Sequence, residues 1–313
     1  MEWTAHHVAL RLRAPLHSGW RTLGNVQQTR PYLTGRQMWG ALTATLTRRT
    51  ERADYQDMGR KVDEQLAFTY FYPSTDRERV THWPWEARDL FSWLYLGSYS
   101  STALAGDGAL AGSLHETEFI APDTRPLTPN GTAKPVFLVG YIFATKECDL
   151  RWQDALVTLR VGGEQGYGWG RLERIVCKPI EACPGDGAPD ATSVDQAPKS
   201  VRLTALSAKR DDKSDAKSDD PPIYSVDLSG DRPVVCVPKD AALLAHTVAT
   251  VTGETRDGQI EPFLGRETSP RGQFGAHITK PTICWRPGGK VTKEQTYQIE
   301  HRGLWTAHLD SRS

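Results

Sequence analysis

The chain has 313 residues, enough for one large domain or two smaller ones with hydrophobic cores of their own. Its 38 basic and 38 acidic residues exclude a simple polycation that coats nucleic acid. Five cysteines without a C-x-x-C pair favour neither a zinc framework nor a disulfide scaffold. The sequence has no secretory signal pattern and no apolar run near the roughly 20 residues of a membrane helix, so we expect a cytoplasmic protein without a membrane partner.

The first predicted strand covers residues 7–13, where Val8, Leu10 and Leu12 alternate with less apolar neighbours. Residues 1–49 as a whole hold seven arginines, no lysine and a single acid, a net charge of +6 inside a neutral protein. The planar guanidinium pairs bidentately with phosphate and stacks on bases. This local basic field indicates an anion-binding surface, with an ordinary solvated surface as the alternative.

A T-x-x-Q capping box from Thr34 to Gln37 predicts that a helix begins there. Trp39, Leu42 and Leu46 recur at helical spacing, so this helix presents one apolar stripe for packing on a sheet.

A second helical pattern covers residues 55–66 and ends before Pro73. The stretch 83–99 is rich in aromatic residues, which can stack on bases but at this density favour a core position. Two strands are predicted next, at 116–120 and 136–144. The latter is almost wholly apolar, which is typical of a central strand covered on both faces.

A third helix begins at Asp149 and extends to Leu159, and a strand follows at 171–177. The resulting order is strand, helix, strand, strand, helix, strand. We therefore predict an α+β fold of the ferredoxin-like (RRM-like) kind in residues 1–180, an antiparallel sheet with helices on one face and a helical insertion between the first helix and the second strand.

The composition changes to Pro, Gly, Ser, Asp and Lys after this unit. Such a segment buries too little apolar surface to offset the conformational entropy that it would lose on folding, so residues 181–230 are predicted to be a flexible linker or insertion. Short strand-like runs return afterwards, and residues 231–313 are predicted to be a β-rich C-terminal region, either a small unit or an extension of the first sheet.

Five glycines fall in the nine positions from Gly162 to Gly170, between a predicted helix and a predicted strand. Glycine lets another backbone come close, because it has no Cβ and is free to adopt positive φ. A Walker loop is excluded because no lysine follows, and a Rossmann fingerprint is excluded because that motif runs from strand to helix. The remaining alternative is a tight connection that merely needs glycine.

A glycine-rich loop from helix to strand at the end of a ferredoxin-like domain resembles the RAMP superfamily of CRISPR-associated proteins. Residues 15–19 (PLHSG) and 30–42 (RPYLTGRQMWGAL) are similar to the family's entry into its first helix. These motifs frame residues 5–178. Residues 272–275 and 283–288 resemble a degenerate second half.

The resemblance implies a guide-RNA (crRNA)-binding subunit of a type III CRISPR effector complex in antiviral defence. Its partners would be the guide RNA, target RNA and other effector subunits. It also implies that the first-helix entry and the glycine loop contact RNA through guanidinium groups, glycine N–H groups and aromatic stacking faces. The candidate RNA-binding residues are Arg21, Arg30, Arg36, Gln37, Gly163, Gly166, Tyr167, Gly168, Trp169 and Arg171.

Subunits of this family that cleave target RNA carry a catalytic aspartate after the first strand. Residues 14–50 contain no Asp or Glu here, so metal-assisted cleavage at that position is not expected. The resemblance therefore implies a capping or backbone subunit without slicing activity, and we predict no metal and no cofactor.

Two alternatives remain. The chain would be a metal-independent endoribonuclease that processes guide-RNA precursors if His17, helped by Arg21 or Arg30, acted as general acid or base. It would be a protein-only scaffold if the glycine loop contacted a neighbouring subunit.

Overall fold

The computed structural model describes residues 1–51, 54–180, 200–206, 222–249, 255–269, 271–273 and 275–308. Most of the predicted linker lies outside these ranges. Residues 200–206 and 222–230 of that segment are described, and they contribute two strands to the C-terminal sheet introduced below. The predicted boundary at 230 therefore falls inside this sheet.

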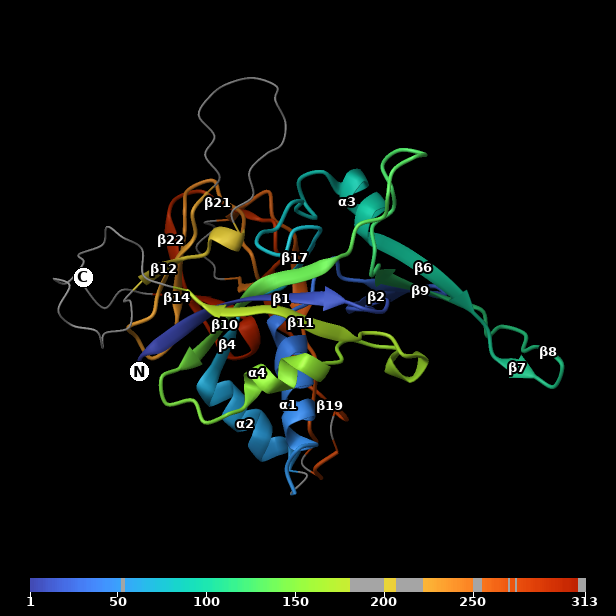
Figure 1. Ribbon diagram of the computed structural model, residues 1–313, viewed down its shortest axis with the longest axis horizontal. Helices are drawn as coiled ribbons and strands as arrows, with labels where there is room; N and C mark the ends of the chain where they lie inside the picture. The colour runs from blue at the N-terminus through green and yellow to red at the C-terminus, as the bar shows by residue number, and fades with distance from the viewer. Residues whose placement is uncertain are drawn as a thin grey trace.

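An antiparallel sheet in the order β11-β1-β10-β4 lies at the centre of the molecule, with β5 pairing the other end of β10 (Figure 1). The predicted strands 7–13, 136–144 and 171–177 all belong to it. Alternate side chains of β1 enter two different cores, Val8 and Leu10 on one face and Ala5 and Ala9 on the other. The strands are β1 Trp3–Leu12, β4 Leu66–Phe68, β5 Tyr72–Ser74, β10 Phe137–Thr145 and β11 Leu172–Pro179.

Helices cover one face of this sheet (Figure 1). The predicted capping box is confirmed in α1, Gly35–Thr47: the Thr34 hydroxyl accepts from the Gln37 backbone N–H, and the Gln37 side chain accepts from the Thr34 N–H. The second helix, α2, is Tyr55–Gln65 and packs against α1. The predicted third helix is shorter than expected, α4 at Trp152–Ala155 followed by a 3-10 turn at Leu156–Thr158.

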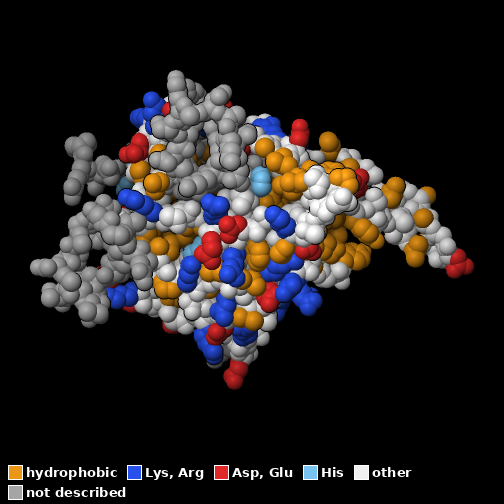
Figure 2. Space-filling model, turned by 45° about the horizontal axis from the view of Figure 1, so that its top comes forward, with side chains coloured by type: hydrophobic (Ala, Val, Ile, Leu, Met, Phe, Trp, Pro, Cys, Tyr) orange, Lys and Arg blue, Asp and Glu red, His pale blue; other side chains and the backbone are white. Residues whose placement is uncertain are grey.

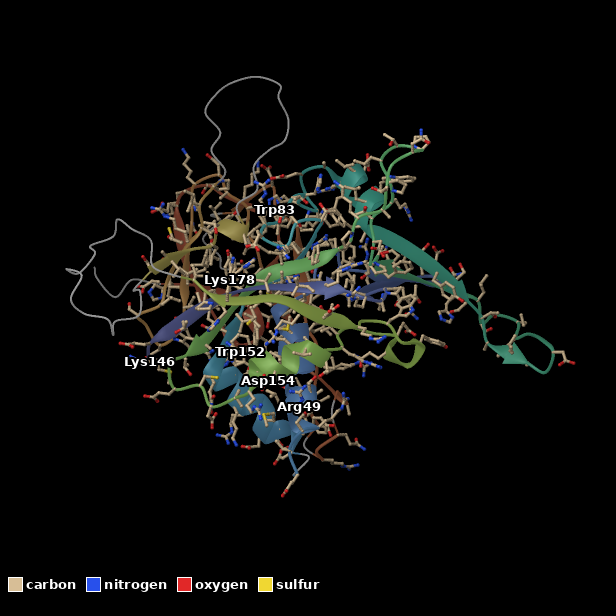
Figure 3. All side chains as sticks on the ribbon, in the orientation of Figure 1. Arg49, Trp83, Lys146, Trp152, Asp154 and Lys178 are labelled. Atoms are coloured by element: carbon tan, nitrogen blue, oxygen red, sulfur yellow. The ribbon has the colours of Figure 1, made fainter. Side chains whose placement is uncertain are left out.

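A hydrogen bond at 3.3 Å joins the Arg49 guanidinium, after α1, to the carbonyl of Asp154 in α4, and Figure 3 shows the two side by side. Trp152 packs edge-on against His6 of the central sheet. These contacts fix both helices to one layer.

The other face of the central sheet is covered by an eight-stranded sheet in the order β12-β13-β14-β22-β23-β15-β20-β17. Trp3 and Tyr141 of the first sheet share a core with Val235 and Trp305 of the second. The β-rich region is therefore a second layer packed on the first. The strands are β12 Ser200–Arg202, β13 Ser225–Asp227, β14 Val234–Val237, β15 Thr247–Val248, β17 Ile260–Phe263, β20 Thr282–Trp285, β22 Gln295–Ile299 and β23 Trp305–Ala307.

Two short ladders complete this region, β16 Thr255–Arg256 with β21 Lys290–Val291 and β18 Arg266–Glu267 with β19 His277–Ile278.

The prediction that residues 116–120 form the second strand of the central sheet is wrong. They form β9, His115–Ile120, which belongs to a separate sheet in the order β2-β3-β9-β6. The second strand of the central sheet, counted along the chain, is instead formed by β4 and β5. This segment was predicted to be the end of the second helix. Each of the two strands is only three residues long, too short to show a period of two. The helical insertion expected between the first helix and the second strand is α2, which lies between α1 and β4, and a further insertion, residues 75–136, follows β5.

The β2-β3-β9-β6 sheet carries a projecting β-arm, defined as residues 96–120 (Figure 1). The arm ends in a small ladder, and helix α3 leads into its first strand. Its elements are β2 Gly19–Leu23, β3 Val26–Thr29, α3 Arg88–Tyr95, β6 Leu96–Ser101, β7 Leu104–Ala105 and β8 Gly108–Ala109.

The aromatic stretch 83–99 divides between core and surface. Trp83, Phe91 and Tyr95 are buried, whereas Trp93 and Tyr99 are exposed. Within the described ranges, no helix is long and apolar enough to cross a membrane.

Candidate functional site

A groove of about 570 Å³ brings together the two sequence motifs and the C-terminal region. Its lining comes from α1, the segment after β1, the glycine loop and residues 262–266. Five arginines line it, and among the described residues that line it there is no Asp or Glu. An acid-free cleft with this many guanidinium groups concentrates anions. The five are Arg30, Arg36, Arg48, Arg160 and Arg266.

Helix α1 forms the floor of the groove with small side chains. Gly40, Ala41 and Ala44 line it between Arg36 near one end of the helix and Arg48 just past the other. Because these residues extend little beyond the helix backbone, an extended ligand can approach α1 closely while an arginine stands on each side of it.

Hydrogen bonds join the base of the glycine loop to the segment after β1. The Gly163 N–H donates to the His17 carbonyl at 2.9 Å, and the Gly170 N–H donates to the Pro15 carbonyl at 2.7 Å. Gly170 has φ +74°, and a Cβ there would overlap the Val161 carbonyl. These glycines serve the close approach of the loop to the segment after β1, and the Gly163 N–H is engaged within the chain.

The tip of the glycine loop is open. Gly166 and Gly168 have no atom within 4 Å of a Cβ position, and the Tyr167 side chain is 77% exposed. The Gly168 N–H donates to the Gln165 carbonyl at 3.0 Å in a 3-10 turn, Gln165–Tyr167. Trp169 instead packs edge-on against Phe119 of the arm, with ring centroids 5.2 Å apart. Of the two predicted stacking residues, Tyr167 thus presents its ring to solvent and Trp169 supports the arm.

Arg30 is buried where β3 ends, and its guanidinium forms an ion pair with Glu261 of β17. The Trp20 indole N–H also donates to Glu261, at 2.9 Å, and Arg286 lies 3.5 Å from the same carboxylate. Burial alone would raise the pKa of Glu261, but the hydrogen bond from His246 and the charge of Arg30 lower it to about 2. Glu261 therefore stays ionised and joins β2 and β3 to the C-terminal sheet.

His246 completes this cluster. Its Nε2 lies 2.5 Å from Glu261, and its Nδ1 lies 2.7 Å from the Tyr70 hydroxyl. Burial lowers the pKa of His246 to about 4, so the ring is neutral at pH 7. A neutral ring donates from one nitrogen only, which assigns the donor to Nε2 and the acceptor to Nδ1.

Arg36 lies in a second cluster on the same side of the groove. It pairs with Glu267 at 2.7 Å, and Glu267 also pairs with Arg302, which contacts Asp63 at 3.1 Å. Burial and the neighbouring charge of Arg302 lower the pKa of Arg36 to about 10, so it remains protonated at neutral pH. A Cβ on Gly265 would overlap the Arg36 guanidinium, so a larger residue there would require Arg36 to move.

Of the other predicted residues, Gln37 is engaged within the chain, whereas Arg21 and Arg171 are exposed. The Gln37 carbonyl oxygen is engaged by the Thr34 N–H and lies 2.8 Å from the Ser18 hydroxyl, which holds the first loop to α1. Arg21 is exposed and stacks on the Trp20 ring at 4.1 Å. Arg171 is exposed at the base of the glycine loop, and its backbone forms an antiparallel β-bridge with Arg160.

His17 lines the groove beside Gly163 and is largely buried. Its Nδ1 lies 2.7 Å from the Glu118 carbonyl, which accepts only, so Nδ1–H is the donor. This geometry fixes the ring orientation.

Sequence reasoning did not find Arg48, Arg160 or Arg266 as groove residues. We call these three the open arginines, because none has an ion-pair partner within the described ranges, and we call Arg30 and Arg36 the paired arginines. Arg160 lies two residues before Gly162, the start of the glycine loop, and this position was an available signal, whereas Arg266 comes from a distant segment and has no local signal. The structure also brings together no group of three or more potential metal ligands among the residues it describes.

No family model matches this chain, and no curated protein sequence matches it. Solved chains that are similar in structure include the following two. One is from "Cryo-EM structure of the Type III-B Cmr-beta bound to cognate target RNA", at TM-score 0.38 and 14% identity, covering 57% of this chain and 61% of that one. The other is from the same kind of complex with AMPPnP, state 1, at TM-score 0.43 and 10% identity, covering 91% and 85%. Similarity at this level does not identify a function, which must come from the site itself.

Proposed function

We propose that the groove binds a single strand of RNA through its phosphates, and that the chain is a guide-RNA-binding subunit of a type III CRISPR effector complex. The observation that carries the proposal is the acid-free groove, in which five arginines meet the first-helix entry and the glycine loop. Phosphate charge supplies most sequence-independent affinity for nucleic acid, and arginine is well suited to it.

The sheet supports the family resemblance behind this proposal. The order β11-β1-β10-β4, all antiparallel, with helices on one face, corresponds to fourth, first, third and second strands of a ferredoxin-like unit when β4 is counted as the second. The RAMP resemblance requires the glycine loop to lie between the last helix and the last strand of such a domain, and the glycine loop here precedes β11, the fourth strand.

Phosphate contact is assigned chiefly to the open arginines, since the N–H groups of Gly163 and Gly168 have acceptors in the chain. Tyr167, two residues after the groove residue Gln165, offers an exposed stacking face. The groove lining has no carboxylate among the described residues to hold a metal ion, which supports a capping or backbone subunit without slicing activity.

Fluorescence anisotropy with a labelled single-stranded RNA tests this function. Arg48→Glu combined with Arg160→Glu should weaken binding at least tenfold, because two phosphate attractions become repulsions. Lys146→Glu is a control for charge reversal outside the groove, since Lys146 follows β10 and does not line the groove, and the affinity of this variant should stay close to that of the unaltered protein (Figure 3). Equal losses in both variants would sink the proposal.

A second candidate is metal-independent processing of guide-RNA precursors, favoured by the position of His17 in the groove wall with Nδ1 fixed. Incubation with repeat RNA in EDTA would show cleavage that His17→Ala abolishes. Intact RNA after incubation with the unaltered protein excludes this candidate and leaves the binding function standing.

A further inference from the structure

Two guanidinium groups lie over the indole of Trp20, a residue that lines the groove. The guanidinium carbon of Arg21 is 4.1 Å from a ring centroid of this indole, and that of Arg286 is 4.5 Å from one. Arg286 is partly buried beside Glu261 of the C-terminal sheet, whereas Arg21 is exposed. Arg21 and Trp20 thus form a stack at the surface beside the groove, which we call the Arg21–Trp20 stack.

An irregularity in β2 brings these two neighbouring side chains together. Successive side chains of a regular strand point to opposite faces, so adjacent residues do not normally stack. In β2 two steps lead from Gly19 to Arg21, whereas their partners on β3 are consecutive residues, so Trp20 is an extra residue in the ladder. Such a bulge re-aims a side chain and is common beside functional sites.

Hydrogen bonds hold both members of the stack in place. The Arg21 Nε–H donates to the Gln28 side-chain oxygen at 2.7 Å, and the Trp20 indole N–H donates to Glu261 at 2.9 Å. Within the described ranges, Arg21 has no ion pair and no hydrogen bond other than the one to Gln28. The guanidinium is therefore a fixed planar surface that is open to a ligand, and its pre-ordering lowers the entropy lost on binding.

The surroundings of Arg21 indicate which part of an RNA strand it contacts. Arg21 is the only Lys or Arg in the four described strands of the β2-β3-β9-β6 sheet. Figure 2 shows the arm on this sheet as orange and white side chains that end in red. A run of phosphates needs several cations, and the sheet supplies one. The face of a guanidinium also accepts an unpaired base, which single-stranded RNA presents.

We propose that one nucleobase of the strand bound in the groove stacks on the exposed face of Arg21. Trp20 supports the guanidinium and holds its plane. This inference rests on the proposed RNA binding and deepens it, because the open arginines contact phosphates whereas Arg21 contacts a base.

Fluorescence anisotropy with two labelled strands tests the stack. One is a short single-stranded RNA, and the other is a ribose-phosphate strand of the same length without bases. Arg21→Lys keeps the positive charge and removes the plane. It should weaken binding of the intact RNA at least about fivefold, the scale of one lost base stack, and leave binding of the abasic strand unchanged.

Arg125→Lys is the matched control. Arg125 is also exposed, and its guanidinium carbon lies 5.1 Å from a ring centroid of Trp93, but neither residue lines the groove. This variant removes an equivalent stack elsewhere and should bind both strands like the unaltered protein. Thermal unfolding of both variants establishes that each is folded.

Two results would overturn the inference and leave RNA binding by the groove standing. One is an Arg21→Lys variant that binds intact RNA as tightly as the unaltered protein does. The other is an equal loss of affinity for both strands, which would assign Arg21 to a phosphate. If the unaltered protein did not bind the intact RNA, the proposed function would fail together with the stack, so the two failures are distinguishable.

Discussion

The paired and open arginines share one groove but differ in what holds them. Arg30 and Arg36 are held by Glu261 and Glu267 on C-terminal strands, whereas Arg48 and Arg160 have no carboxylate partner among the described residues. A buried guanidinium needs a partner because desolvation is costly, and an exposed one does not. The groove thus separates charges that fasten its walls from charges that remain available to a ligand. The predictions below test this division through its effects on stability.

Arg30→Met should have the largest effect. It leaves Glu261 partly buried opposite an uncharged side chain and should lower the free energy of unfolding by about 3–5 kcal/mol. Urea denaturation measures this loss. Arg48→Met is the control and should differ little from the unaltered protein. A loss below about 1 kcal/mol for Arg30→Met would show that this pair does not fasten the wall.

Gly170→Ala and Gly166→Ala compare the base and the tip of the glycine loop. Gly170 has φ +74° and faces the Val161 carbonyl, so alanine there should cost about 1–3 kcal/mol. Gly166 has open space at its Cβ position, and alanine there should be almost neutral. Thermal unfolding midpoints measure both, and equal shifts would contradict the assignment of Gly170 to close backbone packing.

Lowering the pH should weaken the Glu261 cluster. The unfolded chain protonates His246 near pH 6.5 and Glu261 near pH 4.5, whereas folding lowers these pKa values to about 4 and about 2. Between each pair of values the unfolded chain binds more protons, so the stability contributed above pH 6.5 is progressively lost as the pH falls to about 2.

Urea midpoints at pH 7, 5.5 and 4 measure this trend. His246→Gln should flatten the decline between pH 6.5 and 4, and an unchanged decline in that variant would assign it to other groups.

Arg48→Ala with Arg160→Ala should have the smallest effect on stability, within about 0.5 kcal/mol for exposed side chains. Its effect on RNA should be larger: the slope of log affinity against log salt should fall by about 1.4, from about 0.7 for each lost single-strand phosphate contact. Anisotropy titrations at several salt concentrations measure the slope. An unchanged slope would place the RNA elsewhere.

Local patterns predicted the local parts of the fold. The Thr34–Gln37 capping box and the alternation in β1 depend on neighbouring residues, so the sequence was sufficient for them. The strand pair β4 and β5 failed because each has three residues and Leu66 continues the apolar spacing of α2. The position of β9 in another sheet depends on pairing with β3 and β6, which periodicity does not reveal.

The site divides in the same way. The motifs around Arg30, Arg36 and Gly163 were found in the sequence, and the structure brings them to one groove. Their partners Glu261 and Glu267 lie 231 positions further along the chain, beyond the reach of any local pattern. The sequence also could not show that Gln37 is occupied by its own helix cap and by Ser18.

The groove is built from an N-terminal and a C-terminal part of the chain, and their separation in sequence has a consequence for biosynthesis. A ribosome delivers α1 and the glycine loop first, and Glu261, Glu267 and Arg302 emerge roughly a hundred residues later. Until then Arg36 lacks the carboxylate that anchors it, and the cleft lacks one side. Newly made chains therefore acquire both sides of the groove only after residue 302 has been synthesised, so the proposed RNA contact depends on the C-terminal sheet being in place.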